Sequence, residues 1–247
     1  EEKRVRQLKV GFATNPPARV LTSTPEEMGK EADPVALYYR LQDHYGPQQW
    51  WPAETPFEVM VGAILTQNAA WERVEVAIAS LKQHRLMSAA AICSIGQDEL
   101  AEVIRSCGYF NLKAKRLQAF CGWYNGREQA LSALETVPLR EALLAVHGVG
   151  PETADDMLLY AFQRPVFVID TYTRRLFERL GWYPQKSPYQ QLQQFVKGAF
   201  SSWKEAERIV IFNELHGLIV AHAKAFCKKQ PRCMGCPLQC GYEPEKK

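Results

Sequence analysis

Long apolar runs, bulk charge and strand-like alternation are all scarce in this sequence. No run approaches the roughly 20 apolar residues that a membrane-spanning helix needs, which argues against a membrane protein. The net charge of +3 is too small to indicate a nucleic-acid-binding protein by charge alone. Alternation of apolar and polar residues is almost absent, and only residues 165–169 form a short β-branched segment, which argues against a β-rich fold. No signal peptide is visible, so we expect a cytoplasmic chain with no membrane partner.

Cysteine is scarce except near the C-terminus. Cys93, Cys107 and Cys121 stand alone in helix-like stretches, and we expect them to be small buried residues. The other four cysteines crowd together with five, two and three residues between them: Cys227, Cys233, Cys236 and Cys240. A secreted disulfide framework would spread its cysteines more widely. Four thiolates this close suit a [4Fe–4S] cluster or a tetrahedral zinc ion, and the spacing alone does not decide between the two.

The sequence does contain one helical pattern after another from residue 33 onward. Asp33 before Pro34 is an expected N-cap, and Thr55 with Glu58 is an expected capping box ahead of an apolar run. Amphipathic spacing predicts further helices over residues 71–81, 112–123, 139–146, 153–162, 171–180, 189–200 and 204–226. We therefore predict an all-α protein.

The same patterns suggest a division into lobes. We expect one helical lobe at residues 55–165 and a second at residues 33–54 plus 166–226, because first and last helices often pack together. Residues 1–32 are expected to form a flexible arm, and residues 227–247 a cysteine loop and tail.

A short glycine turn joins two of the predicted helices. It consists of His147, Gly148, Val149 and Gly150, and Pro151 then starts the next helix. Glycine lets the backbone turn tightly and expose its N–H groups at a helix N-terminus, where the helix dipole favours an anion. The turn can therefore hold a phosphate without a basic side chain, although an ordinary αα-hairpin has the same pattern.

A single acid, Asp170, follows four apolar residues and precedes a predicted helix. Taken alone, it is typical of an N-cap. Beside an anion-binding turn, the same carboxylate is placed to stabilise a developing positive charge and to orient a water molecule.

The turn, the acid and the four cysteines, in this order, resemble the endonuclease III branch of the helix-hairpin-helix DNA glycosylases. The resemblance covers most of residues 33–240 and implies a two-lobed fold, with Asp170 as the catalytic aspartate and the cysteines as ligands of a [4Fe–4S] cluster. It also implies a bound cation at the hairpin and a basic patch beside the cluster for phosphates. His147 departs from the proline that is usual at its position. The first and third cysteine intervals are five and three residues here, shorter than in the usual pattern, and the second is unchanged. The patch residues are Lys224, Lys228, Lys229 and Arg232.

Two further segments match this family. Gln67, in the Leu-Thr-Gln-Asn run at residues 65–68, resembles the glutamine that fills the hole left by a flipped base. Tyr109 lies in a segment resembling the loop that wedges into the duplex, and Lys113 is expected to be a further DNA contact. Without the resemblance, Gln67 reads as a polar residue at a helix end and Tyr109 as a packed loop aromatic.

Glu152 is the most informative departure from the endonuclease III pattern. The bifunctional enzymes place a lysine there that forms a Schiff base with the sugar, and a carboxylate cannot do so. Taken alone, Glu152 is a first-turn acid that complements the helix dipole. The related 3-methyladenine glycosylases also have glutamate here and share the Trp-Trp-Pro signature. We therefore expect Trp50, Trp51, Asn68 and Glu152 to line the base pocket, although the two tryptophans are also compatible with core packing.

The resemblance implies a monomeric, monofunctional DNA glycosylase, nucleoid-associated if the source is bacterial. Its expected partner is double-stranded DNA with a damaged base, and its expected lesion is an alkylated purine such as 3-methyladenine. Two alternatives stay open: a glycosylase for uracil or thymine in mismatches, and a non-catalytic DNA-binding iron–sulfur protein. Retention of Asp170 argues against the second.

Overall fold

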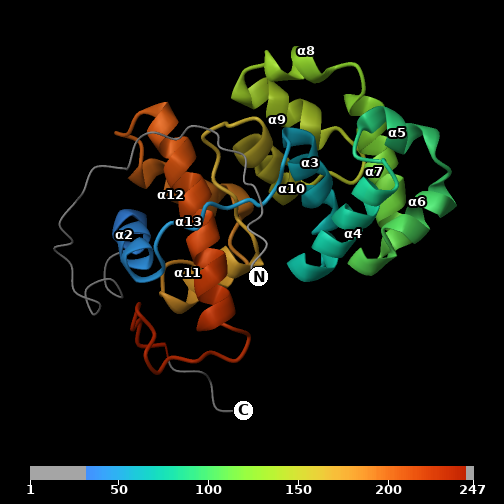
Figure 1. The fold of residues 1–247 in the computed structure, drawn as a ribbon. Helices are drawn as coiled ribbons and strands as arrows, with labels where there is room; N and C mark the ends of the chain where they lie inside the picture. The colour runs from blue at the N-terminus through green and yellow to red at the C-terminus, as the bar shows by residue number, and fades with distance from the viewer. Residues whose placement is uncertain (1–31, 243–247) are drawn as a thin grey trace. The chain divides into compact units, whose positions relative to one another are not determined.

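The computed structural model describes residues 32–242, so the predicted arm lies almost entirely outside the described residues. The chain divides into two compact units. The first unit is built on Ala53–Arg164, and the second on the described residues before Ala53 and after Arg164. Every regular element in residues 32–242 is a helix, which confirms the all-α prediction (Figure 1).

The first unit packs short helices around α3 and α7. Its elements are α3 (Pro56–Leu65), α4 (Trp71–Gln83), α5 (Ala89–Ser94), α6 (Gln97–Val103), η1 (Arg105–Cys107), α7 (Phe110–Tyr124), α8 (Glu128–Ser132), α9 (Thr136–Leu144), α10 (Pro151–Asp156) and η2 (Met157–Ala161). The core of this unit includes α3, whose residues from Glu58 to Leu65 are all buried. Because α3 is buried from Glu58 to its end, the position of the chain after Leu65 is fixed.

The second unit is organised by its longest helix. Its elements are α2 (Pro34–Tyr45), α11 (Thr171–Arg179), α12 (Tyr189–Ala199) and α13 (Glu205–Ala225). Figure 1 shows α13 alongside α2 and α11, and both of these helices pack against it. A single helix therefore supports residues that are far apart in the sequence.

Local capping explains where the first helices begin. The Asp33 carboxylate accepts the backbone N–H groups of Val35 and Ala36 at 2.8 and 3.1 Å, as the predicted N-cap requires. The Thr55 hydroxyl accepts the N–H of Glu58, but the Glu58 carboxylate accepts the N–H of Glu54 instead of that of Thr55. The capping box predicted here is therefore only half formed, and the Glu58 carboxylate also pairs with Lys82 at 2.9 Å.

One helix departs from its predicted form. The helix predicted over residues 153–162 is instead α10 followed by η2, which is a π-helical turn. Asp155 is fully buried at this junction and forms a two-point pair with Arg140, with distances of 2.7 and 3.1 Å. π-turns inside helices are frequent near functional sites.

The β-branched segment at residues 165–169 is extended but joins no sheet in the described part of the chain. Its backbone bonds to α12 side chains instead. The Gln193 amide donates to the Phe167 carbonyl at 2.8 Å, and the Ile169 N–H donates to the Tyr189 hydroxyl at 3.3 Å. With Phe167 and Ile169 buried, this segment delivers Asp170 to the start of α11 at a fixed place.

Candidate functional site

The glycine turn connects α9 to α10 and requires glycine for two reasons. Gly148 has a φ of +87°, in the left-handed region that favours glycine. A Cβ at Gly148 would also lie 2.4 Å from the Arg116 Cγ atom. Val149 is buried and its N–H donates to the Val146 carbonyl at 3.1 Å, so Val149 anchors the turn. The N–H groups of Gly148 and Gly150 are therefore the ones expected to reach a phosphate.

A cleft of about 470 Å³ lies against this turn, within the first unit. Its lining residues are Gln67, Asn68, Arg116, Gly148, Val149, Gly150, Pro151, Glu152 and Thr153. The cleft therefore brings together Gln67, Asn68, Glu152 and the turn, which come from two separate segments of the chain. Arg116 was not anticipated.

Gln67 is held in this cleft by three hydrogen bonds. Its amide nitrogen donates to the Gly148 carbonyl and the Thr153 hydroxyl, both at 2.9 Å. Its amide oxygen accepts from Arg116 Nη1 at 2.5 Å. Nearly the whole bonding capacity of the amide is used, so Gln67 is fixed to the turn before any ligand is bound.

Glu152 occupies the first turn of α10 and lines the same cleft. Its side chain is exposed. The described residues that line the cleft include the guanidinium of Arg116 and no lysine. A guanidinium stays protonated in proteins and is no nucleophile, so the cleft offers a carboxylate and no reactive amine.

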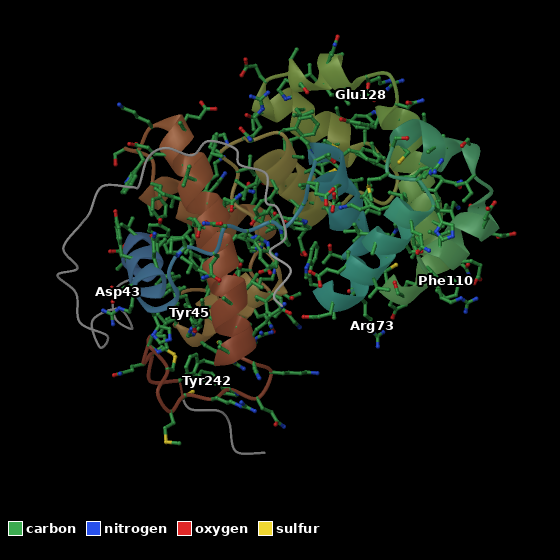
Figure 2. All side chains as sticks on the ribbon, in the orientation of Figure 1. Asp43, Tyr45, Arg73, Phe110, Glu128 and Tyr242 are labelled. Carbon is green, nitrogen blue, oxygen red and sulfur yellow. The ribbon has the colours of Figure 1, made fainter. Side chains whose placement is uncertain are left out.

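Tyr109 lies in the loop before α7 and is 69% exposed. Its φ of +48° and the φ of +68° at Gly108 turn the chain sharply at this point. Figure 2 shows the neighbouring Phe110 at the start of α7, where the Arg105 guanidinium stacks 4.6 Å from its ring centroid. An exposed aromatic side chain on a sharply turned loop is compatible with the predicted wedge.

Lys113 requires a correction. Its side chain is buried, with 1% exposed, and its ammonium donates to the Leu65 carbonyl at 2.7 Å and the Cys107 carbonyl at 2.8 Å. Burial lowers the pKa of this ammonium. Lys113 therefore ties the end of α3 to the loop before Tyr109 and does not present its charge to DNA. Sequence could not show this, because both partners are backbone carbonyls, and the Leu65 carbonyl is brought to Lys113 only by the fold.

Asp170 lies in the second unit, as the N-cap of α11. Its Oδ1 accepts the N–H of Thr173 at 2.7 Å, and its Oδ2 lies 3.5 Å from Nε2 of His216 on α13. Burial by itself would raise the pKa of this carboxyl, but the hydrogen bond and charge of His216 and the Thr173 N–H bring the pKa below its usual value. Asp170 is therefore a buried carboxylate that stays ionised at neutral pH.

Trp50 and Trp51 lie in the second unit, on the segment that follows α2. Both are half-buried, and their ring centroids are 6.1 Å apart with the planes inclined by 61°. The segment is held by α13, since the Glu214 carboxylate accepts the N–H groups of Gln48 and Gln49 at 2.6 and 2.8 Å.

The four C-terminal cysteines lie on the loop after α13. Cys227 and Cys236 are buried, Cys240 is half-buried and Cys233 is exposed. Burial raises the pKa of the Cys240 thiol, the Tyr242 backbone N–H lowers it, and the nearby Cys236, Cys227 and Cys233 raise it further. In residues 32–242 no group of three or more Cys, His, Asp or Glu side chains is arranged to hold a single metal ion.

Four thiolates on one loop suit either a single zinc ion or an iron–sulfur cluster. A zinc site gathers four ligands on one ion, whereas a cubane spreads its thiolates over four irons. Arg179, the last residue of α11, donates from Nη1 to Cys227 Sγ at 3.1 Å, and hydrogen bonds to sulfur are a feature of iron–sulfur sites. Arg179 also holds the carbonyls of Lys228 and Lys229 and stacks on Tyr242, which Figure 2 labels beside this loop.

The predicted basic patch is on this loop and the end of α13. Lys224, Lys229 and Arg232 are exposed, and Lys228 is half-buried. Exposed cations on a loop whose backbone is fixed by Arg179 are suited to phosphate contacts.

Comparison with known proteins shows which family this chain resembles. Residues 61–201 match the model described as HhH-GPD superfamily base excision DNA repair protein. A Methanocaldococcus jannaschii protein, provisionally named a DNA repair glycosylase, is 44% identical over 208 residues, which cover 82% of this chain and 92% of that protein. Endonuclease III of Sulfolobus acidocaldarius is 28% identical over 213 residues, which cover 82% and 92% of the two chains.

The fold is also similar to that of a solved structure. The crystal structure of H. pylori 3-methyladenine DNA glycosylase (MagIII) bound to 1,N6-ethenoadenine has a TM-score of 0.68 at 28% identity. The match covers 78% of this chain and 97% of that chain.

The helical fold and the hairpin define a helix-hairpin-helix DNA glycosylase. The chain belongs to the HhH-GPD superfamily of base excision DNA repair proteins, which confirms the resemblance inferred from its sequence. No helix in residues 32–242 is both long and apolar enough to cross a membrane.

Proposed function

We propose that this chain is a monofunctional DNA glycosylase that hydrolyses the N-glycosidic bond of an alkylated purine such as 3-methyladenine. One observation carries the proposal: Glu152 lines the cleft, no lysine is among the lining residues, and the family resemblance places Glu152 where the bifunctional enzymes have their lysine. The similarity to the H. pylori 3-methyladenine DNA glycosylase supports the choice of lesion.

Asp170 acts on the sugar in the proposed reaction. As the bond from the base to C1′ breaks, the base leaves with the electron pair and positive charge develops on the deoxyribose. The ionised carboxylate stabilises this charge and accepts a proton from the water that attacks C1′. A purine alkylated at a ring nitrogen is already cationic and leaves as a neutral base, so no strong general acid is required. The products are the free base and an abasic site.

The first unit supplies the proposed duplex contacts. The N–H groups of Gly148 and Gly150 hold a backbone phosphate at the hairpin, next to the exposed His147. Tyr109 enters the base stack while the damaged nucleotide flips out. Gln67 takes the place of the flipped base from its fixed position in the cleft. A monovalent cation at the hairpin would share the Gly148 carbonyl with the Gln67 amide, since a carbonyl oxygen has two lone pairs.

The first test is the nature of the product. We expect wild-type protein to leave an intact abasic site, with strand breaks only after alkali or heat, because no amine is available to attack C1′. Borohydride should trap no covalent protein–DNA adduct. A wild-type adduct would show that another amine does the chemistry, and the monofunctional assignment would be wrong.

A matched pair of variants sharpens this test. Glu152→Lys introduces an amine into the cleft and is expected to yield a borohydride-trapped adduct. Glu128→Lys makes the same change on α8, at an exposed residue outside the cleft, and should yield none. Equal trapping by both variants would mean that Glu152 has no special position relative to the sugar.

We also propose that Cys227, Cys233, Cys236 and Cys240 hold a [4Fe–4S] cluster. When bound, the cluster cross-links the loop and keeps its basic side chains in place for phosphates. Purified protein should be yellow-brown with about four irons per chain, as a four-cysteine cubane requires. Cys233→Ser should lose the iron. Cys93→Ser should retain it; Cys93 is exposed, so the expectation that it is buried was wrong, whereas Cys107 and Cys121 are buried as expected. Colourless protein with one zinc per chain would contradict the proposal.

A further inference from the structure

The helix α13 contains a glycine that its secondary structure does not explain. Gly217 lies inside this 21-residue helix, where glycine is a poor helix former compared with alanine. A Cβ at Gly217 would lie 2.8 Å from the Trp50 Cβ and 3.3 Å from both the Trp50 Cγ and the Gln48 Cβ. Real Cβ atoms essentially never approach as closely as 2.8 Å, so any larger residue would displace the segment that carries Trp50.

Glu214 holds the same segment from the preceding turn of α13. One carboxylate oxygen accepts the Gln48 N–H at 2.6 Å, and the other accepts the Gln49 N–H at 2.8 Å. Hydrogen bonds from N–H groups to a carboxylate are about twice as strong as neutral ones. The segment also turns at Gly46, whose carbonyl, like that of Tyr45, accepts from the Gln48 amide.

These two residues lie on either side of His216, which contacts Asp170. Glu214 accepts hydrogen bonds from the backbone before Trp50, and Gly217 leaves room for the Trp50 Cβ. His216, which lies between these two residues in sequence, faces the Asp170 carboxylate. One stretch of α13 therefore supports both the aromatic segment and the acid inside the second unit. Figure 1 shows α13 extending through this unit.

We propose that Glu214 and Gly217 are positioning residues that fix the backbone of Gln48, Gln49 and Trp50, and thereby set the place at which Trp50 and Trp51 receive the lesion. The part that concerns the lesion rests on the proposed function. Neither residue touches the reacting atoms; both act through the segment that they hold.

The central variant is Gly217→Ala. Alanine is the better helix former, so a weakened helix cannot explain a loss of function in this variant. We expect the apparent Kd for the lesion duplex to rise by about tenfold, while the single-turnover rate at saturating enzyme falls by less than about threefold, because ground-state binding is lost and Asp170 is untouched. Gly198→Ala on α12 is the control, since a Cβ there would meet no atom within 4 Å.

Glu214→Gln tests the second contact. Glutamine keeps the size of the side chain but offers one acceptor oxygen and places an N–H₂ donor against the other backbone N–H. It should raise the apparent Kd in the same way. Glu205→Gln, at an exposed carboxylate on the first turn of the same helix, should behave as wild type.

A readout that does not depend on the lesion is the ¹⁹F NMR spectrum of protein labelled with 5-fluorotryptophan. The chain has six tryptophans, and Trp50→Phe and Trp51→Phe assign two of the resonances. Gly217→Ala and Glu214→Gln should shift these two and leave the other four in place, whereas both controls should shift none. Unshifted resonances would overturn the proposal.

The kinetic comparison uses a lesion duplex from which the wild-type chain excises the base. If the wild-type chain excises no lesion, the ¹⁹F spectrum alone tests the positioning role. If the wild-type chain does not excise methylated purines, the lesion assignment is wrong. The positioning role is then tested by the spectrum, which does not depend on the lesion. A shift in the two resonances together with unchanged Kd on the excised lesion would also overturn the role in lesion binding.

Discussion

Asp170→Asn is expected to reduce base excision by about 10²–10³-fold, the usual loss when a group that stabilises transition-state charge is removed. Asparagine is as good an N-cap as aspartate, and its oxygen can still accept the Thr173 N–H that Asp170 accepts at 2.7 Å. The fold and the binding of lesion DNA should therefore be nearly unchanged. Single-turnover excision assays and equilibrium binding to the same duplex separate the two effects.

Glu178→Gln is the control for this experiment. It removes a negative charge from the same helix, at an exposed side chain, and should alter excision by less than about twofold. If Asp170→Asn excised at nearly the wild-type rate, the carboxylate would not be the group that stabilises the sugar, and the proposed mechanism would be wrong.

Trp51→Ala is expected to reduce excision of 3-methyladenine more than excision of any neutral base. A cationic base placed over an indole face gains roughly 0.5–2 kcal/mol, which corresponds to about 2- to 30-fold in binding. Two further variants, Trp51→Leu and Trp51→Phe, separate the contribution of the aromatic face from that of apolar bulk. Trp51→Leu retains apolar bulk and loses the aromatic face, so it should resemble Trp51→Ala in selectivity, whereas Trp51→Phe should stay closer to wild type.

The measurement for this series is the ratio of excision rates for a methylated and a neutral lesion in the same duplex context. Global changes in folding or in phosphate binding affect both rates equally and cancel in the ratio. An unchanged ratio in Trp51→Leu would show that the indole does not select for positive charge.

The longer helices could be predicted from the spacing of their apolar residues. The Asp33 cap and the helices at α4, α7, α11, α12 and α13 lie within a few residues of the predicted bounds, because each has its own local signal. The short helices α5, α6 and α8 were missed. They are held by packing of residues such as Ile92, Leu100 and Leu131, which carry no distinctive spacing over five to seven residues.

The side chains of the candidate site and of the two proposals differ in the same way. The hairpin, Asp170 and the cysteines were accessible because each stands in a short contiguous motif. Arg116 was not, because it follows lysines in a run that looks like a solvated helix face. Glu214 and His216 were also missed, since their partners lie in other helices and loops and only the folded chain brings them together.

The most direct test of the central claim is an excision assay of the wild-type chain on duplexes that carry 3-methyladenine, uracil opposite guanine or thymine opposite guanine. Released bases are identified by mass spectrometry, and strand breaks are counted before and after alkali. We predict release of the methylated purine, with breaks only after alkali. Release of uracil or thymine from mismatches, with no action on methylated DNA, would contradict the account and establish the mismatch alternative in its place.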